Sequence, residues 1–368
     1  MPYQEPADAG NAHRAAFREQ TRELIRQRFR AAAEARYGYF QPSTDSPPAW
    51  ADSVEGYRED LRRLLGWPLV HTKADPNPAL KRQAVVEDEH GTIERIHAEA
   101  LPGWWMYALL FLPTPINPST PPPLVIAQHG GGGTPELAAN LFRTGNYGDM
   151  VNRLRQRGLA VVAPQCARWS PEFDPELPQD FTSQTPAPTA DPAGLHPRQW
   201  HAMLTATGGS LVALESFGIQ RLLTAALNLP ELQNSRVGML GLSYGGMLTL
   251  LTAALDTRIA AAAPSACLHD GSNQALMHDL AWPAGLTRFT AAELAGLICP
   301  RPLALEIGKN DTHHIVAKAE PQAQRVRSFY TELGIPDRFL FNHHDGKHEI
   351  DTSSDTVFDF LDQHLRQA

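Results

Sequence analysis

The chain has 368 residues, of which 42% are hydrophobic and 20% are charged, and its formal net charge is −8. This composition excludes a disordered chain and fits one large globular domain with some additional structure. There is no global excess of Lys and Arg to neutralise phosphates, so no nucleic-acid partner is expected. The N-terminus lacks a basic and then apolar signal and no run approaches a membrane span, so we predict no membrane partner and a cytoplasmic location.

Residues 1–78 are expected to form a helical extension. The spacing over residues 11–37 predicts a long helix with apolar residues on one face and arginines at every fourth position on another. Two glutamates at helical spacing favour a solvated face for these arginines, and the alternative is a face that docks on a second subunit. A second short helix is expected over residues 53–65. Because a lone helix with one apolar stripe is marginal in water, the first helix is predicted to support a homo-oligomer or to pack on the domain over residues 79–368.

Strand patterns begin near residue 82 and come in two kinds. Three runs, over residues 83–86, 92–98 and 105–112, are separated by short turns and predict an antiparallel sheet edge. Later apolar runs are continuous and alternate with helices, as parallel strands buried on both faces do. These runs cover residues 124–127, 159–163, 237–240, 259–263, 303–307 and 339–341. We therefore predict an α/β fold with a mostly parallel, doubly wound sheet and an antiparallel N-terminal edge, with ligand chemistry at the carboxyl ends of the strands.

Two long connections lack a regular period. The proline-rich segment over residues 113–123 could be taken for a polyproline ligand, but its place between two strands favours a stiff surface connector. Residues 168–198 are rich in Pro, Asp and Thr and follow the carboxyl end of a strand, so they are predicted to cover the site. A helix over residues 200–227 is expected to cross back, with Gly208 and Gly209 allowing a close approach.

The serine at position 243 lies in the run Gly241-Leu242-Ser243-Tyr244-Gly245, between an apolar strand and an apolar helix. This pattern is typical of a nucleophile elbow, in which small residues on either side of the serine prevent collisions where the strand and the helix nearly touch. The helix N-terminus would face any negative charge that develops at the serine. The pattern predicts that Ser243 is a nucleophile in acyl transfer, and the alternative is a glycine-rich turn with an ordinary serine.

Four glycines follow His129, at residues 130–133. Their backbone N–H groups can approach a ligand oxygen, and a loop beside the elbow would supply half of an oxyanion hole. A phosphate-binding loop is excluded because no Lys followed by Ser or Thr comes after the glycines. The remaining alternative is a flexible turn without function.

A serine nucleophile needs an imidazole that takes its proton and a carboxylate that orients the imidazole. In proteins with a nucleophile elbow the acid and then the histidine follow the serine in the chain, on loops after later strands. Asp311, just past the strand over residues 303–307, is the predicted acid. His348 is the predicted base, because Gly346 gives its loop freedom to fold back. Asp270 is the alternative acid and is otherwise expected to line the pocket mouth or cap a turn.

A metal site is an alternative use of the histidines near the C-terminus, which are His313, His314, His343, His344 and His348. It is disfavoured because His348-Glu349 has no second histidine at the spacing of a metalloprotease helix, and because the pairs lie far apart in sequence. The three cysteines are an odd number at wide spacing, which argues against both a disulfide framework and a zinc site. We therefore expect buried thiols, no metal and no cofactor.

With these motifs in order, the chain resembles the α/β-hydrolase superfamily over residues 80–368. Within it, the chain is similar to bacterial acetyl-xylan-esterase-like and dienelactone-hydrolase-related esterases. Cys-Pro-Arg-Pro-Leu at residues 299–303 resembles the strand that leads to the catalytic Asp of that group. Gly346-Lys347-His348-Glu349 resembles its Gly-Gly-His-Glu ending, with Lys347 in place of the second glycine.

The resemblance implies an α/β-hydrolase fold with Ser243, Asp311 and His348 as the catalytic triad and the backbone N–H groups of Gly131 and Tyr244 as the oxyanion hole. It implies a serine esterase that acts through an acyl-enzyme on short, acetyl-like esters of small molecules or oligosaccharides. One alternative is a peptidase of the prolyl-oligopeptidase type, although the chain is too short to hold the propeller of those enzymes. The other is a noncatalytic binding protein on the same scaffold, which usually lacks a triad member.

Overall fold

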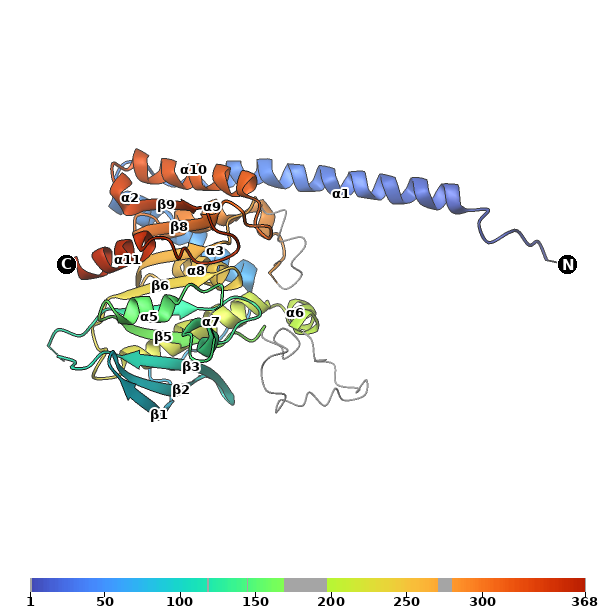
Figure 1. Cartoon of the computed structure of the whole chain (residues 1–368). Helices are drawn as coiled ribbons and strands as arrows, with labels where there is room; N and C mark the ends of the chain where they lie inside the picture. Colours follow the sequence, from blue (N-terminus) through green and yellow to red (C-terminus); the bar gives the residue numbers. More distant parts are fainter. Residues whose placement is uncertain (1, 118, 144, 169–196, 271–279, 368) are drawn as a thin grey trace.

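A single sheet of nine strands runs through the described part of the chain in the order β1-β2-β3-β5-β4-β6-β7-β8-β9 (Figure 1). The computed structural model describes residues 2–117, 119–143, 145–168, 197–270 and 280–367. The strands are β1 (Leu80–Asp88), β2 (Gly91–Leu101), β3 (Trp104–Leu112), β4 (Leu124–Gln128), β5 (Ala160–Pro164), β6 (Val237–Leu242), β7 (Ile259–Ser265), β8 (Leu303–Gly308) and β9 (Phe339–His344). Strands β1, β2, β3 and β5 pair antiparallel, and all pairs from β5 to β9 are parallel. The predicted fold class is confirmed.

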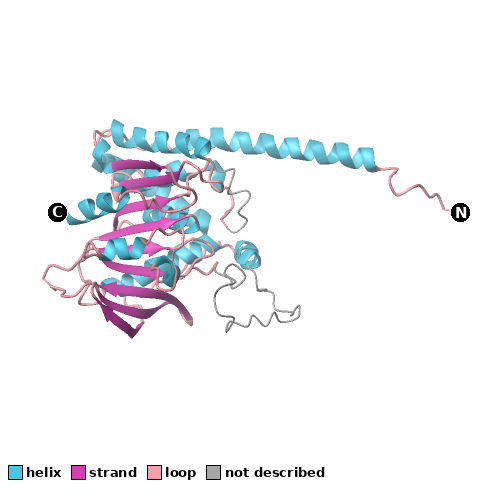
Figure 2. Ribbon diagram, viewed as in Figure 1, coloured by secondary structure: helices cyan, strands magenta, loops and turns pink. Residues whose placement is uncertain are grey.

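Helices cover both faces of this sheet (Figure 2). They are α1 (Asn11–Tyr39), α2 (Pro47–Ser53), α3 (Glu55–Leu65), α4 (Pro135–Ala138), α5 (Met150–Arg155), α6 (Pro197–Ala206), α7 (Leu211–Leu227), α8 (Tyr244–Leu255), α9 (Ala291–Ile298), α10 (Val316–Glu332) and α11 (Thr356–Arg366), with 3₁₀ turns η2 (Gly285–Thr287) and η3 (Pro336–Arg338). Side chains of α7, α8, α9 and α10 share one hydrophobic core, and those of α4, α5 and α11 share another. Every residue of β4, β5 and β6 is buried between the two cores, which is why these strands read as continuous apolar runs. All three cysteines are buried and unbridged, as predicted.

The N-terminal helices differ in how they contact the sheet domain. Figure 1 shows that the first part of α1 projects away from the rest of the molecule. Helices α2 and α3, in contrast, bury Trp50, Val54, Leu61 and Leu65 in the core on the α8 face. Among the described residues, no helix is both long enough and apolar enough to cross a bilayer. The division into an extension over residues 1–78 and a domain over residues 79–368 stays a prediction.

The helix expected over residues 200–227 is in fact two helices, α6 and α7, so that prediction is wrong. The chain breaks at Gly208, whose φ of +85° is outside the helical region. The break allows the close approach that was expected here: Trp67 N–H donates to the carbonyl of Gly208 at 3.0 Å, and a Cβ on Gly209 would lie 2.7 Å from the carbonyl oxygen of Trp67. The two glycines therefore join the segment after α3 to α6 and α7.

Candidate active site

Ser243 occupies the turn between β6 and α8. Its backbone has φ 62° and ψ −118°, a conformation that is costly for a residue with a side chain and that persists only when its surroundings hold it. The N–H of Ser243 donates to the carbonyl of Ser265 at the end of β7, at 2.9 Å. The strained turn predicted as a nucleophile elbow is therefore present at the carboxyl end of β6.

The glycines around Ser243 are required by contacts of the backbone. A Cβ on Gly241 would lie 2.4 Å from the carbonyl oxygen of Gly245, and a Cβ on Gly245 would lie 2.3 Å from that of Gln128. A Cβ on Gly246 would lie 2.3 Å from the carbonyl oxygen of Ser265. Since each obstacle is backbone, a side chain at any of these positions would displace a strand or the helix.

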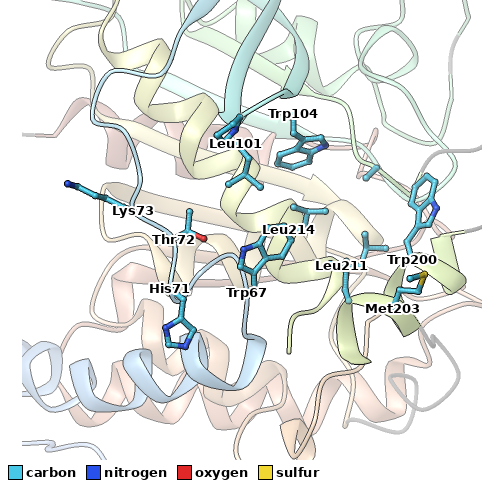
Figure 3. Close-up of a pocket in the computed structure, with 13 residues that line it drawn as sticks. Trp67, His71, Thr72, Lys73, Leu101, Trp104, Trp200, Met203, Leu211 and Leu214 are labelled. Atoms are coloured by element: carbon cyan, nitrogen blue, oxygen red, sulfur yellow. The ribbon is translucent and has the colours of Figure 1, made fainter. Parts of the chain in front are cut away.

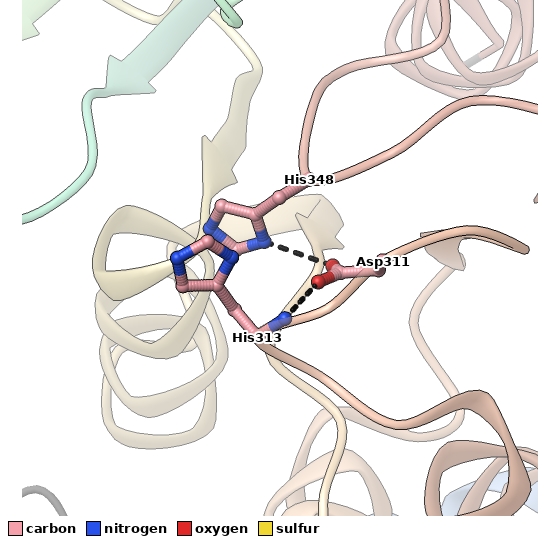
Figure 4. A group of neighbouring side chains, drawn as sticks. All are labelled: Asp311, His313 and His348. Carbon is pink, nitrogen blue, oxygen red and sulfur yellow. Dashed lines mark hydrogen bonds and ion pairs between the residues drawn. The ribbon is translucent and has the colours of Figure 1, made fainter.

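Asp311 and His348 meet on the loops that follow β8 and β9 (Figure 4). The Nδ1–H of His348 donates to Oδ2 of Asp311 at 2.8 Å, and Oδ1 of Asp311 accepts the backbone N–H groups of His313 and His314 at 2.7 and 2.9 Å. Burial opposes ionisation of this carboxyl, but the hydrogen bonds outweigh it and hold the pKa of Asp311 below its ordinary value. The carboxylate is thus ready to orient His348 and to stabilise its charged form.

The ring of His348 is also held by its histidine neighbours. His314 stacks on it at 5.5 Å between ring centroids, and His313 lies 4.5 Å from it in a tilted arrangement. Burial lowers the pKa of His314 to about 4, so that this ring stays neutral and does not compete for a proton. His313 and His314 therefore act as packing partners of the predicted base.

The loop of His348 is connected to the glycine loop beside Ser243. Asn146 donates from Nδ2 to the carbonyl of His348 at 3.0 Å, and its own carbonyl accepts the N–H of Ile350 at 2.9 Å. The next residue, Tyr147, accepts the N–H of Gly130 at 3.0 Å. In the part of the chain that the structure describes, no hydrogen bond joins Ser243 to His348; such contacts are often long before substrate binds.

The predicted oxyanion donors flank the nucleophile. A Cβ on Gly130 would lie 3.5 Å from Cβ of Ser243, which places the glycine loop against the elbow. Gly131 follows in that loop, and Tyr244 is the first residue of α8, where backbone N–H groups point out of the helix end. The two N–H groups therefore belong to the two segments that border Ser243.

A buried glutamate lies behind this region. Glu215 in α7 accepts the backbone N–H of Arg168 at 3.2 Å and the hydroxyl of Tyr244 at 3.4 Å. The guanidinium of Arg168 stands 5.0 Å from the centre of the Tyr244 ring. Desolvation, only partly offset by these hydrogen bonds, raises the pKa of Glu215 to about 8. This cluster fixes the residue that follows the nucleophile.

A second buried carboxyl joins the strand ends beneath the acid. Glu306 in β8 accepts from Oγ of Ser265 and from Nδ2 of Asn342, each at 2.9 Å, and from the N–H of Asp351 at 3.3 Å. Burial raises the pKa of Glu306 despite these donors. The network holds the ends of β7, β8 and β9 in register, and the loops of Asp311 and His348 begin there.

The other predicted candidates lie elsewhere or fall outside the described residues. Asp270, the alternative acid, lies 3.9 Å from Nζ of Lys318. His343 faces Glu320 at 3.8 Å. The predicted cover over residues 168–198 falls almost wholly on residues that the structure does not describe.

Asp311, His313 and His348 also form the group of possible metal ligands that the described residues contain, with one atom of each lying within 4.8 Å of the others (Figure 4). Both oxygens of Asp311 already accept hydrogen bonds, as described above. A bound zinc ion would have to break the bond between His348 and Asp311. The arrangement fits an imidazole held for proton transfer better than a metal centre.

Several contributors were missed at the level of sequence, namely Asn146, Tyr147, Arg168, Glu215 and Glu306. Two of them carried a usable signal, since Glu215 and Glu306 are lone acids inside apolar runs and such groups are rarely buried without a specific partner. Asn146 and Tyr147 lie in a loop without a period, and only the fold brings them to the site.

A comparison with known protein families finds a match in the segment around Ser243. Residues 217–269, which include Ser243, match the family model of acetyl xylan esterase (AXE1). No curated protein matches the chain.

Solved structures share the fold. A candidate acetyl xylan esterase of Bacteroides fragilis is 17% identical with a TM-score of 0.68, over 93% of this chain and 89% of that one. A glucuronoyl esterase of Solibacter usitatus is 13% identical with a TM-score of 0.61, over 89% and 98%. Acetyl xylan esterase 1 of a Thermoanaerobacterium species is 15% identical with a TM-score of 0.54, over 91% and 98%. The chain therefore has the α/β-hydrolase fold that its sequence motifs predicted, and its segment around Ser243 is similar to the acetyl xylan esterase family.

Proposed function

We propose that the chain hydrolyses short-chain esters of carbohydrates through Ser243, His348 and Asp311. The observation that supports this most directly is the 2.8 Å hydrogen bond from Nδ1 of His348 to Asp311. It leaves Nε2 of His348 as the nitrogen that can take a proton, on a loop linked to the glycine loop beside the strained Ser243. A nucleophile, an oriented base and a buried acid are the parts that acyl transfer needs.

The first half of the reaction forms an acyl-enzyme. Oγ of Ser243 attacks the carbonyl carbon of the ester while Nε2 of His348 accepts its proton. The negative charge that develops on the carbonyl oxygen is stabilised by the N–H groups of Gly131 and Tyr244 and by the positive end of α8. Collapse of this intermediate breaks the bond to the alcohol, which leaves with the proton held by His348.

The second half returns the enzyme to its starting state. Nε2 of His348 takes a proton from water, and the resulting hydroxide attacks the acyl carbon. The intermediate expels Oγ of Ser243, which recovers its proton from His348, and the carboxylic acid leaves. Asp311 keeps its negative charge throughout and stabilises the imidazolium in both halves.

The substrate class follows from the similarity to carbohydrate esterases. Proteins with this fold and detectable similarity include esterases named for acetyl xylan and glucuronoyl esters. We infer acetyl as the acyl group and a sugar or oligosaccharide as the alcohol. The alternatives are a peptidase and a noncatalytic binding protein.

The proposal is tested with the purified full-length chain and its Ser243→Ala variant. A fluorophosphonate probe should label the wild type at Ser243, whereas a binding protein would stay unlabelled. Acetyl esters should be cleaved, with rates falling from acetate to octanoate, whereas a peptidase would prefer peptide amides. Ser243→Ala should lose about 10⁴ to 10⁶ in kcat and keep its melting temperature. A variant with near-normal turnover would remove Ser243 from the mechanism.

We also propose that α1 mediates self-association. Phe17, Leu24 and Ile25 are 71%, 66% and 62% exposed, and an apolar face of this kind is marginal in water. Arginines on the same helix pair with Glu19 and Glu23, which supports the predicted solvated face for the arginine stripe. The cytoplasmic location stays a prediction, and cell fractionation with a tagged chain would test it.

A further inference from the structure

A second feature near the elbow is a cavity of about 880 Å³ between the segment after α3, the turn between β2 and β3, and helices α6 and α7. Three tryptophans from separate elements line it: Trp67 after α3, Trp104 at the start of β3 and Trp200 in α6. Figure 3 shows their indole rings at three separate points around the cavity. Of the seven tryptophans in the chain, three therefore border one cavity.

The positions of two of these tryptophans are built into the fold. A Cβ on Gly218 in α7 would lie 2.8 Å from Cη2 of Trp104, so the absence of a side chain at Gly218 makes room for the indole. Trp67 is fixed through its backbone to Gly208, at 3.0 Å, and against Gly209. Even so, residue Trp67 is 37% exposed. A large aromatic ring held at a cavity and left open to solvent is typical of a binding surface.

The remaining lining is apolar on one side and polar on another. Leu211 and Leu214 of α7 line one side, while the polar residues His71, Thr72 and Lys73 line another. His71 holds a φ of 64°, a left-handed conformation that is uncommon for a residue other than glycine. A pyranose ring has the matching chemistry, with a face of C–H groups that packs on an indole and a rim of hydroxyls that needs hydrogen-bonding partners. A lipid chain would use the apolar surface and leave the polar side without a partner.

This cavity shares a wall with the proposed active site. Ala167 lines it, and the next residue, Arg168, packs its guanidinium on the ring of Tyr244 beside the nucleophile. Leu214 lines it as well, and the following Glu215 accepts the hydroxyl of Tyr244. The residues next to two lining residues therefore contact Tyr244, which directly follows Ser243 in the chain.

We propose that this cavity, lined by Trp67, Trp104 and Trp200, binds pyranose rings of the carbohydrate part of the substrate. The inference rests on the proposed esterase function for its link to Ser243, but sugar binding itself needs no catalysis. The volume of about 880 Å³ lies at the upper end of the range for sites that hold small ligands and leaves room for more than one ring.

Binding is tested first without chemistry, by adding unacetylated xylotetraose to full-length Ser243→Ala and following binding by calorimetry and saturation-transfer NMR. Binding is expected, and Trp67→Ala or Trp104→Ala in the same background should weaken it about tenfold, since each loses an aromatic contact. Trp105→Ala is the matched control, because Trp105 neighbours Trp104 in β3 but packs under Lys81 at 3.9 Å and does not line the cavity. Failure of xylotetraose to bind, or equal binding by all variants, would overturn the proposal.

Kinetics then test the link to Ser243. The ratio of kcat/KM for acetylated xylotetraose to kcat/KM for p-nitrophenyl acetate should fall about tenfold in Trp67→Ala and Trp104→Ala, through KM, and should keep its value in Trp105→Ala. Trp104→Phe should restore part of the ratio. A preference for p-nitrophenyl octanoate that disappears in Trp104→Ala would instead assign the cavity to the acyl chain. Sugar binding by a chain without esterase activity would uphold the cavity and overturn the proposed function.

Discussion

Asp311 and His348 come from neighbouring strands of the sheet, and Nδ1 of His348 lies 2.8 Å from Oδ2 of Asp311. His348 follows Asp311 by 37 positions, and α10 and β9 lie between them, so the contact exists only once β9 has paired with β8. The same pairing brings Glu306 under the two loops through Asn342. The geometry favours Asp311 over Asp270 as the acid.

The roles of Asp311 and Asp270 can be distinguished by a matched pair of substitutions. Asp311→Asn removes the charge that stabilises the imidazolium of His348 and should lower kcat by about 10⁴. Asp270→Asn should lower kcat by about tenfold or less. Steady-state rates on p-nitrophenyl acetate, with circular dichroism to check folding, measure both. The opposite ranking would move the acid to Asp270.

The elbow should not tolerate a methyl group. Gly245→Ala places a Cβ 2.3 Å from the carbonyl oxygen of Gln128 and 2.4 Å from that of His129, and this buried end of β4 cannot move freely. We expect a loss of about 1–3 kcal/mol of stability together with most of the activity. Gly56→Ala is the control, because nothing lies within 4 Å of its Cβ position in α3. Replacing this glycine in the first turn of α3 should instead leave the stability unchanged or raise it slightly, because alanine loses less backbone freedom on folding. Equal effects of the two substitutions on urea denaturation would contradict the packing argument.

Much of the sheet could be predicted from sequence because its strands are buried on both faces. The apolar runs in β4 and β6 are continuous, and all residues of these two strands are buried. The Gly-x-Ser-x-Gly motif marks the turn that follows β6. The break between α6 and α7 was missed, because helix periodicity continues across Gly208 and Gly209 and only the contact with Trp67 explains it. Local sequence patterns predict helices and strands, whereas the contact that a glycine makes with a distant segment depends on the tertiary structure.

The residues of the site likewise fall into those that the sequence predicts and those that only the structure reveals. Ser243, Asp311 and His348 follow from chain order and strand ends, which one sequence displays. Asn146 and Tyr147 link two loops that lie about 200 residues apart, and no local pattern encodes such a contact. These linking residues were therefore visible only in the structure.

Two shortened chains should separate the roles of the N-terminal helices. A chain beginning at Glu34 keeps Arg36, which contacts Glu293 at 3.3 Å and the carbonyl of Leu286 at 2.6 Å, so it should keep the stability of the full chain. A chain beginning at Asp75 also loses Trp50 and its neighbours in α2 and α3, each buried side chain being worth about 1.5–3 kcal/mol, and should unfold readily.

Light scattering on the same two chains measures oligomeric state. Self-association of the full chain should disappear in the chain that begins at Glu34, because that chain lacks the exposed apolar residues of α1. An unchanged oligomer would place the interface elsewhere. A destabilised Glu34 chain would show that the projecting turns of α1 contact the sheet domain.

The last prediction concerns Glu215, whose carboxyl is buried among α7, Arg168 and Tyr244. Its pKa is raised from an ordinary value of 4.5 to about 8, chiefly by desolvation. Below pH 4.5 both the folded and the unfolded chain hold this proton, so stability does not depend on it. Between the two values the unfolded chain releases the proton and the folded chain keeps it, so stability falls as pH rises. Above pH 8 the loss is complete.

Glu215→Gln removes this titration and keeps an oxygen that can accept from Arg168 and Tyr244. The stability of the variant relative to the wild type should therefore rise between about pH 5 and pH 8, by up to about 1.4 kcal/mol per pH unit, and stay level above pH 8, in thermal and urea unfolding. Comparing the two chains cancels the contributions of other buried carboxyls such as Glu306. Glu89→Gln, at a side chain that is 87% exposed, is the matched control and should follow the wild type at every pH. If the difference in the free energy of unfolding between Glu215→Gln and the wild type did not increase with pH, Glu215 would be ionised in the folded chain and held as an ion pair by the guanidinium of Arg168.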